Sequence, residues 1–93
     1  VMAMTMALAL DLTADNIRVN CVCPGSIDTA MIEQMFHSAS EPDVLREAVI
    51  AKHPIGRLAR APEVAALIAF LASDDASYMT GAAVPVDGGR SVR

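Results

Sequence analysis

The stretch from residue 17 to residue 29, IRVNCVCPGSIDT, constrains the fold of this chain more than any other part of its sequence. Its first seven residues are β-branched or apolar for the most part, which is typical of a short strand buried in a parallel sheet. Pro24 and Gly25 interrupt that pattern, because Pro-Gly is a strong turn signal. The sequence therefore predicts a buried strand over 17–23 that stops abruptly at a polar turn.

Helical patterns lie on both sides of this strand. Residues 2–14 hold good helix formers without Gly or Pro, and Asn16 suits a left-handed stop. Apolar residues occupy nearly every side of this helix, so we expect both of its faces to be covered. A later helix is predicted from Pro62 to about Ser73, because apolar residues recur there at i, i+3, i+4 and i+7. A brief strand is expected within 82–89.

Two shorter helices are expected between these elements. One covers roughly 29–38, with Asp28 and Thr29 as capping residues, and the other covers roughly 43–51, with Pro42 in its first turn. The alternation of helix and strand predicts an α/β fold in which the two strands run parallel, joined by a right-handed crossover. Two parallel strands alone make a poor sheet, so we expect further strands to come from elsewhere.

The composition also indicates that this chain needs covering surfaces. Of its 93 residues 54% are hydrophobic and only 19% are charged, which argues against disorder. A chain this short buries only about 60–65% of its unfolded surface, so apolar side chains are in excess. The chain also enters an apolar helix directly at Val1. We therefore expect it to be the C-terminal piece of a longer protein.

Charge and hydropathy exclude several function classes. The net charge is −4, the basic residues are scattered and only one Tyr and two Phe occur, which argues against nucleic-acid binding. The longest apolar stretch, Val1 to Leu12, is shorter than the ~20 residues of a membrane span and lacks the basic start of a signal peptide. Two cysteines without an export signal indicate a reducing compartment, so a cytoplasmic location is expected.

The residues of this chain predict no metal site and no catalytic set of their own. Cys21 and Cys23 would share one face of a strand, but their spacing suits neither a zinc knuckle nor a redox pair, so buried filler is the simpler interpretation. His53 stands beside Pro54 and is interpreted as a loop residue. Neither a nucleophile elbow nor a glycine-rich phosphate loop occurs in the sequence.

The end of the predicted strand is more informative. Ligands of open α/β sheets bind beyond the carboxyl ends of the strands, where residues 26–29 would offer backbone groups and hydroxyls. A helix that begins at residue 29 would direct free N–H groups toward an anion. On these grounds two interpretations stay open, a rim of a ligand pocket and a plain strand-to-helix turn.

Two longer segments resemble one known family. LALDLTADNIRVNCVCPGSIDTAM resembles the helix, sixth strand and P-G-x-I-x-T segment of the short-chain dehydrogenases/reductases. HPIGRLARAPEVAALIAFLASDDASYMTGAAVPVDGG is similar to the last helix, last strand and terminal D-G-G turn of that family. The resemblance covers essentially all 93 residues. It implies that residues 1–93 are the C-terminal part of a single NAD(P)-binding domain, a Rossmann-like, doubly wound parallel sheet.

The resemblance also implies site residues. Pro24 and Gly25 would shape the turn under the nicotinamide, the backbone of Ile27 would hold the carboxamide, and the hydroxyl of Thr29 would reach the carboxamide or the pyrophosphate. Residues from about 30 to 52 would form the lid over the substrate.

Within this lid the candidate substrate contacts are Met31, Met35 and Phe36, for which packing inside the lid is an equal alternative. Asn20, Arg57 and Asp87 are interpreted as residues that order the neighbouring backbone.

Several family motifs do not occur in this chain. The glycine-rich dinucleotide motif, the catalytic Asn and Ser and the Y-x-x-x-K pair are absent, and Tyr78 is followed four residues later by Ala82 rather than Lys. Family spacing would place Y-x-x-x-K just upstream of Val1. The chain alone is therefore not expected to transfer a hydride.

For the complete protein, the resemblance implies an NAD(P)-dependent oxidoreductase that acts on an alcohol or carbonyl, with NAD and NADP both open. It also implies a homo-oligomer, a dimer or more commonly a tetramer. The alternative is a non-catalytic oligomerisation or interaction module built from the same fold.

Overall fold

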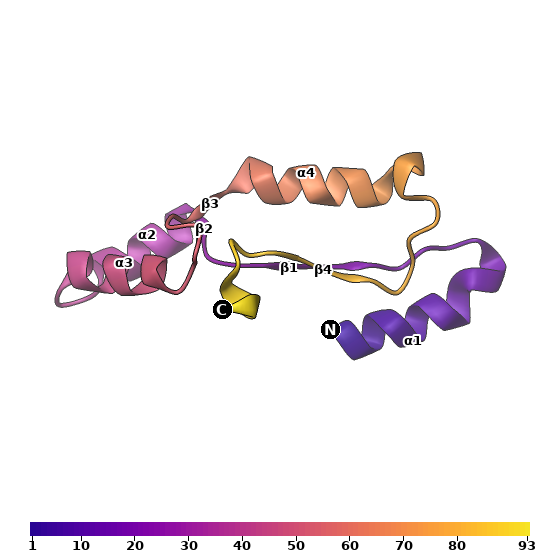
Figure 1. Cartoon of the computed structure of the whole chain (residues 1–93), viewed down its shortest axis with the longest axis horizontal. Helices are drawn as coiled ribbons and strands as arrows, with labels where there is room; N and C mark the ends of the chain where they lie inside the picture. The colour runs from indigo at the N-terminus through magenta and orange to yellow at the C-terminus, as the bar shows by residue number, and fades with distance from the viewer.

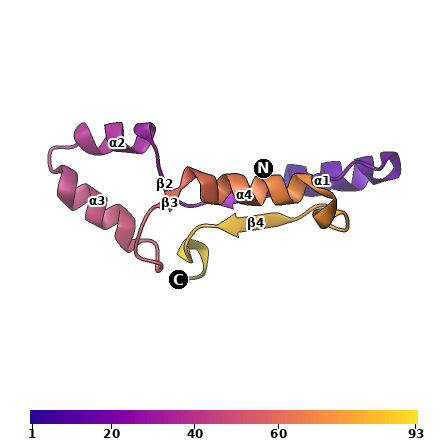
Figure 2. The same ribbon diagram turned by 90° about the horizontal axis from the view of Figure 1, so that it is seen from above.

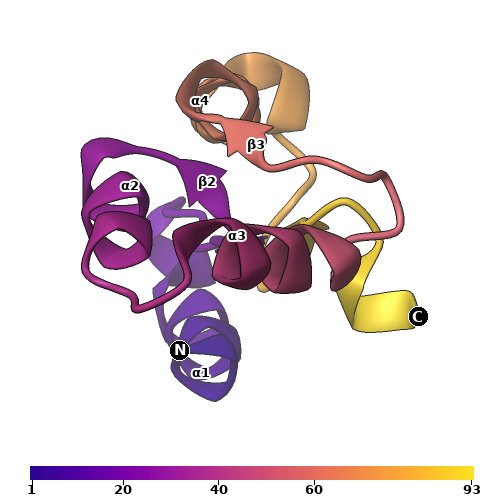
Figure 3. The same ribbon diagram turned by 90° about the vertical axis from the view of Figure 1, so that its left-hand side faces the viewer.

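The computed structural model describes all 93 residues as an elongated body of 52 × 24 × 23 Å. Its centre is a parallel pair of strands, β1 (Cys21–Pro24) and β4 (Ala83–Val86). The helix α4 (Ala61–Ala72) covers one face of this pair, and α1 (Met2–Leu12) lies on the other face (Figures 1 and 3). The predicted α/β class, with parallel strands and flanking helices, is confirmed.

The strand predicted over 17–23 is shorter in the structure. Its ladder begins at Cys21, which pairs with Ala83, and continues through Pro24, which pairs with Val86. Residues 17–20 are extended but belong to no ladder. The prediction of a strand from residue 17 was therefore wrong at its start.

Hydrogen bonds from the 73–82 loop explain this late start. Asn20 donates from Nδ2 to the Met79 carbonyl at 2.9 Å and accepts the Ala82 N–H on Oδ1 at 3.0 Å, while the Val19 carbonyl accepts the Gly81 N–H at 2.7 Å. These bonds satisfy the backbone that a strand partner would otherwise occupy. The expectation that Asn20 orders neighbouring backbone is confirmed.

A second parallel pair, β2 (Ile27–Asp28) and β3 (Ala59–Arg60), lies just beyond the carboxyl end of β1 (Figure 1). Between them the chain forms α2 (Ala30–His37) and α3 (Pro42–Ala51). Figure 2 shows these two helices as a V whose closed end is the 38–41 loop. The sequence predicted both helices but neither of the two-residue strands.

Local signals set most of the helix ends. Asn16 has φ 59° and follows the 3-10 turn at the end of α1, as expected for a left-handed stop. Pro42 occupies the first turn of α3. Thr29 caps α2, because its Oγ1 accepts the Ile32 N–H at 3.4 Å. Asp28 lies in β2 instead, so its predicted capping role was wrong. The 3-10 turns are Thr13–Asp15, Asp74–Ala76 and Arg90–Val92.

Most apolar side chains of the helices are exposed. Only nine of the 93 residues are buried, among them Ala9 of α1, Val64 and Leu71 of α4, and Phe36 of α2. On α1, Met4 is 60% exposed and Leu10 is 82% exposed. None of the helices has both the length and the hydropathy of a membrane span. Within residues 1–93 only the face of α1 that holds Thr5 and Ala9 is covered, so the expectation that both faces of this helix are covered is not met by this chain alone.

Candidate functional site

The turn that follows β1 separates two hollows. The first has a volume of about 370 Å³ and is walled by the turn residues Gly25, Ser26 and Ile27, by the cap Thr29, and by the apolar side chains of α2, Met31, Ile32 and Met35. It thus has a polar end, where the chain leaves β1, and an apolar wall on α2. Such a hollow can hold a flat, amphipathic group.

The structure brings together five of the seven site residues that the sequence predicted. Gly25, Ile27, Thr29, Met31 and Met35 all line the first hollow. Met31 is 81% exposed, so its side chain is available to a ligand.

The other two lie outside this hollow. Pro24 is the last residue of β1, and Phe36 is only 1% exposed. The guanidinium of Arg46 stacks over the Phe36 ring, 4.6 Å from its centroid. The geometry of Phe36 therefore supports the packing alternative.

Two hydroxyls at the polar end have hydrogen atoms to donate. Thr29 Oγ1 accepts the Ile32 N–H, but its own hydrogen has no acceptor within the chain, and the Ser26 hydroxyl has no partner. A hydroxyl can donate one hydrogen bond while it accepts others. These two groups can therefore bind an amide oxygen or a phosphate oxygen in the hollow.

The second hollow, of about 320 Å³, lies on the other side of Gly25 and Ser26. Asp87 lies on its far wall, where its carboxylate accepts the N–H groups of Gly89 at 3.0 Å and Ser91 at 2.9 Å. Hydrogen bonds from Ser91, and then from Gly89, hold the pKa of Asp87 below its usual value. The carboxylate is thus engaged in shaping the terminal turn, as the sequence indicated.

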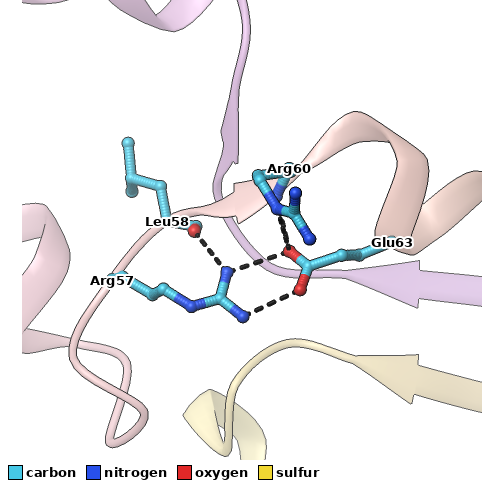
Figure 4. Close-up of polar contacts among 4 residues, drawn as sticks. All are labelled: Arg57, Leu58, Arg60 and Glu63. Atoms are coloured by element: carbon cyan, nitrogen blue, oxygen red, sulfur yellow. Dashed lines mark hydrogen bonds and ion pairs between the residues drawn. The ribbon is translucent and has the colours of Figure 1, made fainter.

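Arg57 and Glu63 also line this second hollow and form an ion pair. Figure 4 shows the polar contacts of this pair. Arg57 donates two hydrogen bonds to the Glu63 carboxylate, at 2.9 and 2.8 Å, and a third to the Leu58 carbonyl. Glu63 also accepts the Arg60 N–H at 2.7 Å. The Arg57 bonds, followed by the Arg60 N–H, lower the pKa of Glu63 to about 2. Arg57 thus fixes the loop before α4, as expected from the sequence.

This depressed pKa predicts an acid-sensitive contribution to stability. Glu63 titrates near 4.5 when unfolded and near 2 when folded, so its contribution is complete above about 4.5 and disappears as the pH falls toward 2. In Glu63→Gln we expect a lower free energy of unfolding at neutral pH. As the pH falls from about 4.5 toward 2, this free energy should decrease less in the variant than in the unmodified protein. Denaturant unfolding at a series of pH values measures both. Glu47→Gln is the control, because Glu47 makes no ion pair; an equal pH dependence in both variants would contradict the prediction.

His53 lies in the loop after α3, as predicted, but sequence reasoning missed its burial and its contact with the turn. It is 3% exposed, and its Nε2 accepts the Ser26 N–H at 3.1 Å, while Nδ1 lies 2.9 Å from the Val49 carbonyl. A histidine beside a proline gave no sign of this contact, because the partner is 27 positions away in the sequence. Only the fold brings α3 back under the turn.

The two cysteines lie beneath the turn and are free thiols. Cys21 is buried and Cys23 is half-buried, and burial together with the Cys21 thiol raises the pKa of Cys23. A raised pKa keeps a thiol protonated, and only the thiolate is a good nucleophile or metal ligand. No group of three or more His, Cys, Asp or Glu side chains is arranged to hold a metal ion.

The family model described as enoyl-(acyl carrier protein) reductase matches residues 1–91. The chain is 39% identical to dehydrogenase/reductase SDR family member 6 of Rattus norvegicus, over 99% of this chain and 38% of that protein. It is 47% identical to a 3-oxoacyl-(acyl-carrier-protein) reductase of Pseudomonas aeruginosa, over 91% of this chain and 32% of that protein. A meso-2,3-butanediol dehydrogenase of Serratia marcescens is 44% identical, over 96% and 33% respectively.

The fold matches as well. A short-chain dehydrogenase family protein of Francisella tularensis superposes with a TM-score of 0.92 at 36% identity, over 99% of this chain and 40% of that one. The chain thus spans two fifths or less of the length of these proteins. Family model, relatives and structure agree, and the chain belongs to the short-chain dehydrogenase/reductase family.

Proposed function

We propose that the first hollow is one wall of the nicotinamide and substrate site of an NAD(P)-dependent oxidoreductase. The observation that carries this proposal is the pairing of two free hydroxyl donors with an apolar wall at the carboxyl end of β1. Ligands of α/β sheets bind at that end. In this proposal residues 1–93 belong to a single Rossmann domain, and the protein works in the cytoplasm, where its two thiols stay reduced.

The residues present fit a nicotinamide. The Thr29 and Ser26 hydroxyls can donate to its carboxamide or to the pyrophosphate, and the Ile27 backbone can bind the carboxamide. Because Gly25 has no Cβ, the nicotinamide ring can lie close to the turn. Pro24 ends the strand and sets the direction of that turn. The cofactor would supply or accept a hydride at the nicotinamide ring.

The substrate is an alcohol or a carbonyl compound in this proposal. Two of the relatives are, by name, a 3-oxoacyl reductase and a butanediol dehydrogenase, which supports that class. The segment 30–52 would act as the substrate lid, with Met31 and Met35 as apolar contacts. Phe36 remains a predicted contact that its burial does not favour.

Nucleotide binding is the direct test. NADH and NADPH are each titrated into the protein as its gene encodes it, with any residues beyond 1–93 included, and nicotinamide fluorescence is recorded. Enhancement with either nucleotide supports the proposal, and the tighter of the two identifies the cofactor. Absence of enhancement and of any heat of binding with both nucleotides would overturn it.

Removal of the Thr29 hydroxyl should weaken nucleotide binding. Thr29→Val keeps the shape of the side chain but loses the donor and the helix cap, so we expect a Kd for the preferred nucleotide about tenfold higher and a helix weakened by about 1 kcal/mol. Thr29→Ser retains the hydroxyl and should bind within about threefold of the unmodified protein. Equal Kd values for the two variants would contradict a role of the hydroxyl.

A second candidate function is self-association without catalysis. The exposed apolar side chains of α1 and of α4, including Leu10 and Phe70, favour this alternative. In this alternative, a second copy of the chain covers these side chains, in a dimer or tetramer. Light scattering after size exclusion gives the mass in solution. A mass in solution that is a multiple of the chain mass, without nucleotide binding, would support the non-catalytic module. The same mass together with nucleotide binding supports an oligomeric oxidoreductase.

A further inference from the structure

His53 occupies the space between three separate turns. Its ring nitrogen Nε2 meets the backbone of Ser26, its Nδ1 meets the last turn of α3, and a Cβ added at Gly88 would lie 3.6 Å from the His53 Cβ. The side chain is 3% exposed and makes two polar contacts, both to backbone. A buried polar ring with both nitrogens engaged holds its neighbours in one arrangement.

The two partners define the state of the imidazole ring. The Val49 carbonyl can only accept, so the hydrogen lies on Nδ1, and the Ser26 N–H can only donate, so Nε2 carries the lone pair. The ring is therefore the neutral Nδ1–H tautomer. Any side chain that lacks an acceptor at the Nε2 position would leave the Ser26 N–H without a partner.

Gly25 allows this contact. A Cβ at residue 25 would lie 2.9 Å from His53 Nε2, so only glycine lets the ring approach the turn so closely. The next residue, Ser26, lines both hollows. Two backbone hydrogen bonds hold it, because His53 Nε2 accepts its N–H at 3.1 Å and its carbonyl accepts the Ala59 N–H at 3.0 Å. The orientation of the Ser26 N–H side of the turn therefore depends on the hydrogen bond that His53 accepts.

We propose that His53 is a positioning residue that fixes the Gly25–Ser26–Ile27 turn for ligand binding and joins this turn to the end of α3. His53 joins the turn to α3 because the Val49 carbonyl accepts a hydrogen bond from its Nδ1, so the ring that orients Ser26 is itself oriented by α3. The effect on ligand binding rests on the proposed function. The effect on the turn stands independently of it.

The test compares His53→Leu, which has no acceptor, with His53→Gln, whose Oε1 can reach the place of Nε2. Tyr78→Leu is the control, because Tyr78 is fully exposed, makes no side-chain hydrogen bond and lies outside the proposed lid. In the protein without nucleotide, we expect the Ser26 amide hydrogen to exchange about tenfold faster in His53→Leu and near the original rate in His53→Gln and Tyr78→Leu. We also expect the Kd for nucleotide to rise about tenfold in His53→Leu only.

Long-range proton–nitrogen spectra give a separate readout, in which the Nδ1 and Nε2 of His53 should appear as a protonated and an unprotonated nitrogen. The opposite tautomer, or an unchanged Ser26 exchange rate in His53→Leu, would overturn the proposal. Faster exchange with an unchanged Kd would also overturn it, because His53 would then be structural only. If the unmodified protein binds no nucleotide, the proposed function fails, and the Ser26 exchange rate alone decides whether His53 holds the turn.

Discussion

Gly25→Ala is expected to weaken nucleotide binding more than any other single-methyl change in this chain. The added Cβ would lie 2.9 Å from His53 Nε2, 3.0 Å from the Asp87 Cα and 3.1 Å from the Asp87 carbonyl oxygen. Two of these three atoms are backbone and cannot rotate away. The turn must therefore move away from the backbone of Asp87, which directly follows β4, at a cost of about 1–3 kcal/mol. Both hollows then change shape.

The measurements are the thermal midpoint and the Kd for nucleotide. Gly56→Ala is the matched control, because Gly56 has φ +85° but its Cβ would meet no atom within 4 Å. That control should lose some stability through backbone strain and keep its Kd. The double variant Gly25→Ala/His53→Ala should not recover, since the Asp87 backbone remains in place. Full recovery in the double variant would show that the contact with Asp87 is not limiting.

Phe36→Ala is expected to separate α2 from α3. Phe36 is the largest fully buried side chain of the protein, and it packs beneath Arg46, whose Nη2 also donates to both carboxylate oxygens of Glu33, each at 2.7 Å. Truncation of a buried Phe to Ala costs about 3–5 kcal/mol. Because these two helices extend from one end of the body, we expect the loss to appear as local opening rather than global unfolding (Figure 2).

Amide exchange by mass spectrometry resolves this local opening. In Phe36→Ala, peptides from α2 and α3 should exchange much faster, while those from α4 stay protected; Phe36→Leu, which keeps most of the volume, should show a small effect. Met35→Ala is the comparison for direct contact, because Met35 lines the hollow and is 47% exposed. A higher substrate KM in Phe36→Ala with unchanged exchange in α2 would instead support the substrate contact that the sequence suggested.

A smaller change should loosen the same helix pair. Arg46→Ala removes the ion pair with Glu33 and the cation over the Phe36 ring, whereas Arg46→Lys keeps a charge that can pair with Glu33 but lacks the planar guanidinium that stacks on the ring. We expect faster amide exchange in α3 for the Ala variant and an intermediate rate for the Lys variant. Identical rates in all three proteins would show that Phe36 alone holds the helices together.

Local signals explain why the helices could be predicted. Asn16, Pro42 and Pro62 each act within one turn of chain, so their positions mark helix ends without knowledge of the fold. β2 and β3 have only two residues each, too few for an alternating pattern, and they exist because Ile27 and Ala59 are brought together. The late start of β1 has the same origin, in loop contacts that no local pattern encodes.

The candidate site could be predicted in part for a related reason. Thr29 follows from a family motif at a strand end and Met35 from the lid segment that the resemblance implies, and the structure places both in one hollow. His53 could not be identified, because its only sequence signal was the neighbouring Pro54. Its partner Ser26 becomes a neighbour through the return of α3, and such contacts depend on tertiary structure alone.

The pairing of β1 with β4 also has a kinetic consequence. Cys21 meets Ala83, and Ser26 meets both His53 and Ala59, so the turn between the two hollows is held by residues far apart along the chain. Contacts of high sequence separation form slowly, because a long loop must close before they stabilise anything. We therefore expect α1 and α4 to form early and the Gly25–Ser26–Ile27 turn to form among the last steps of folding. A folding intermediate would then have its helices but no ligand-binding site.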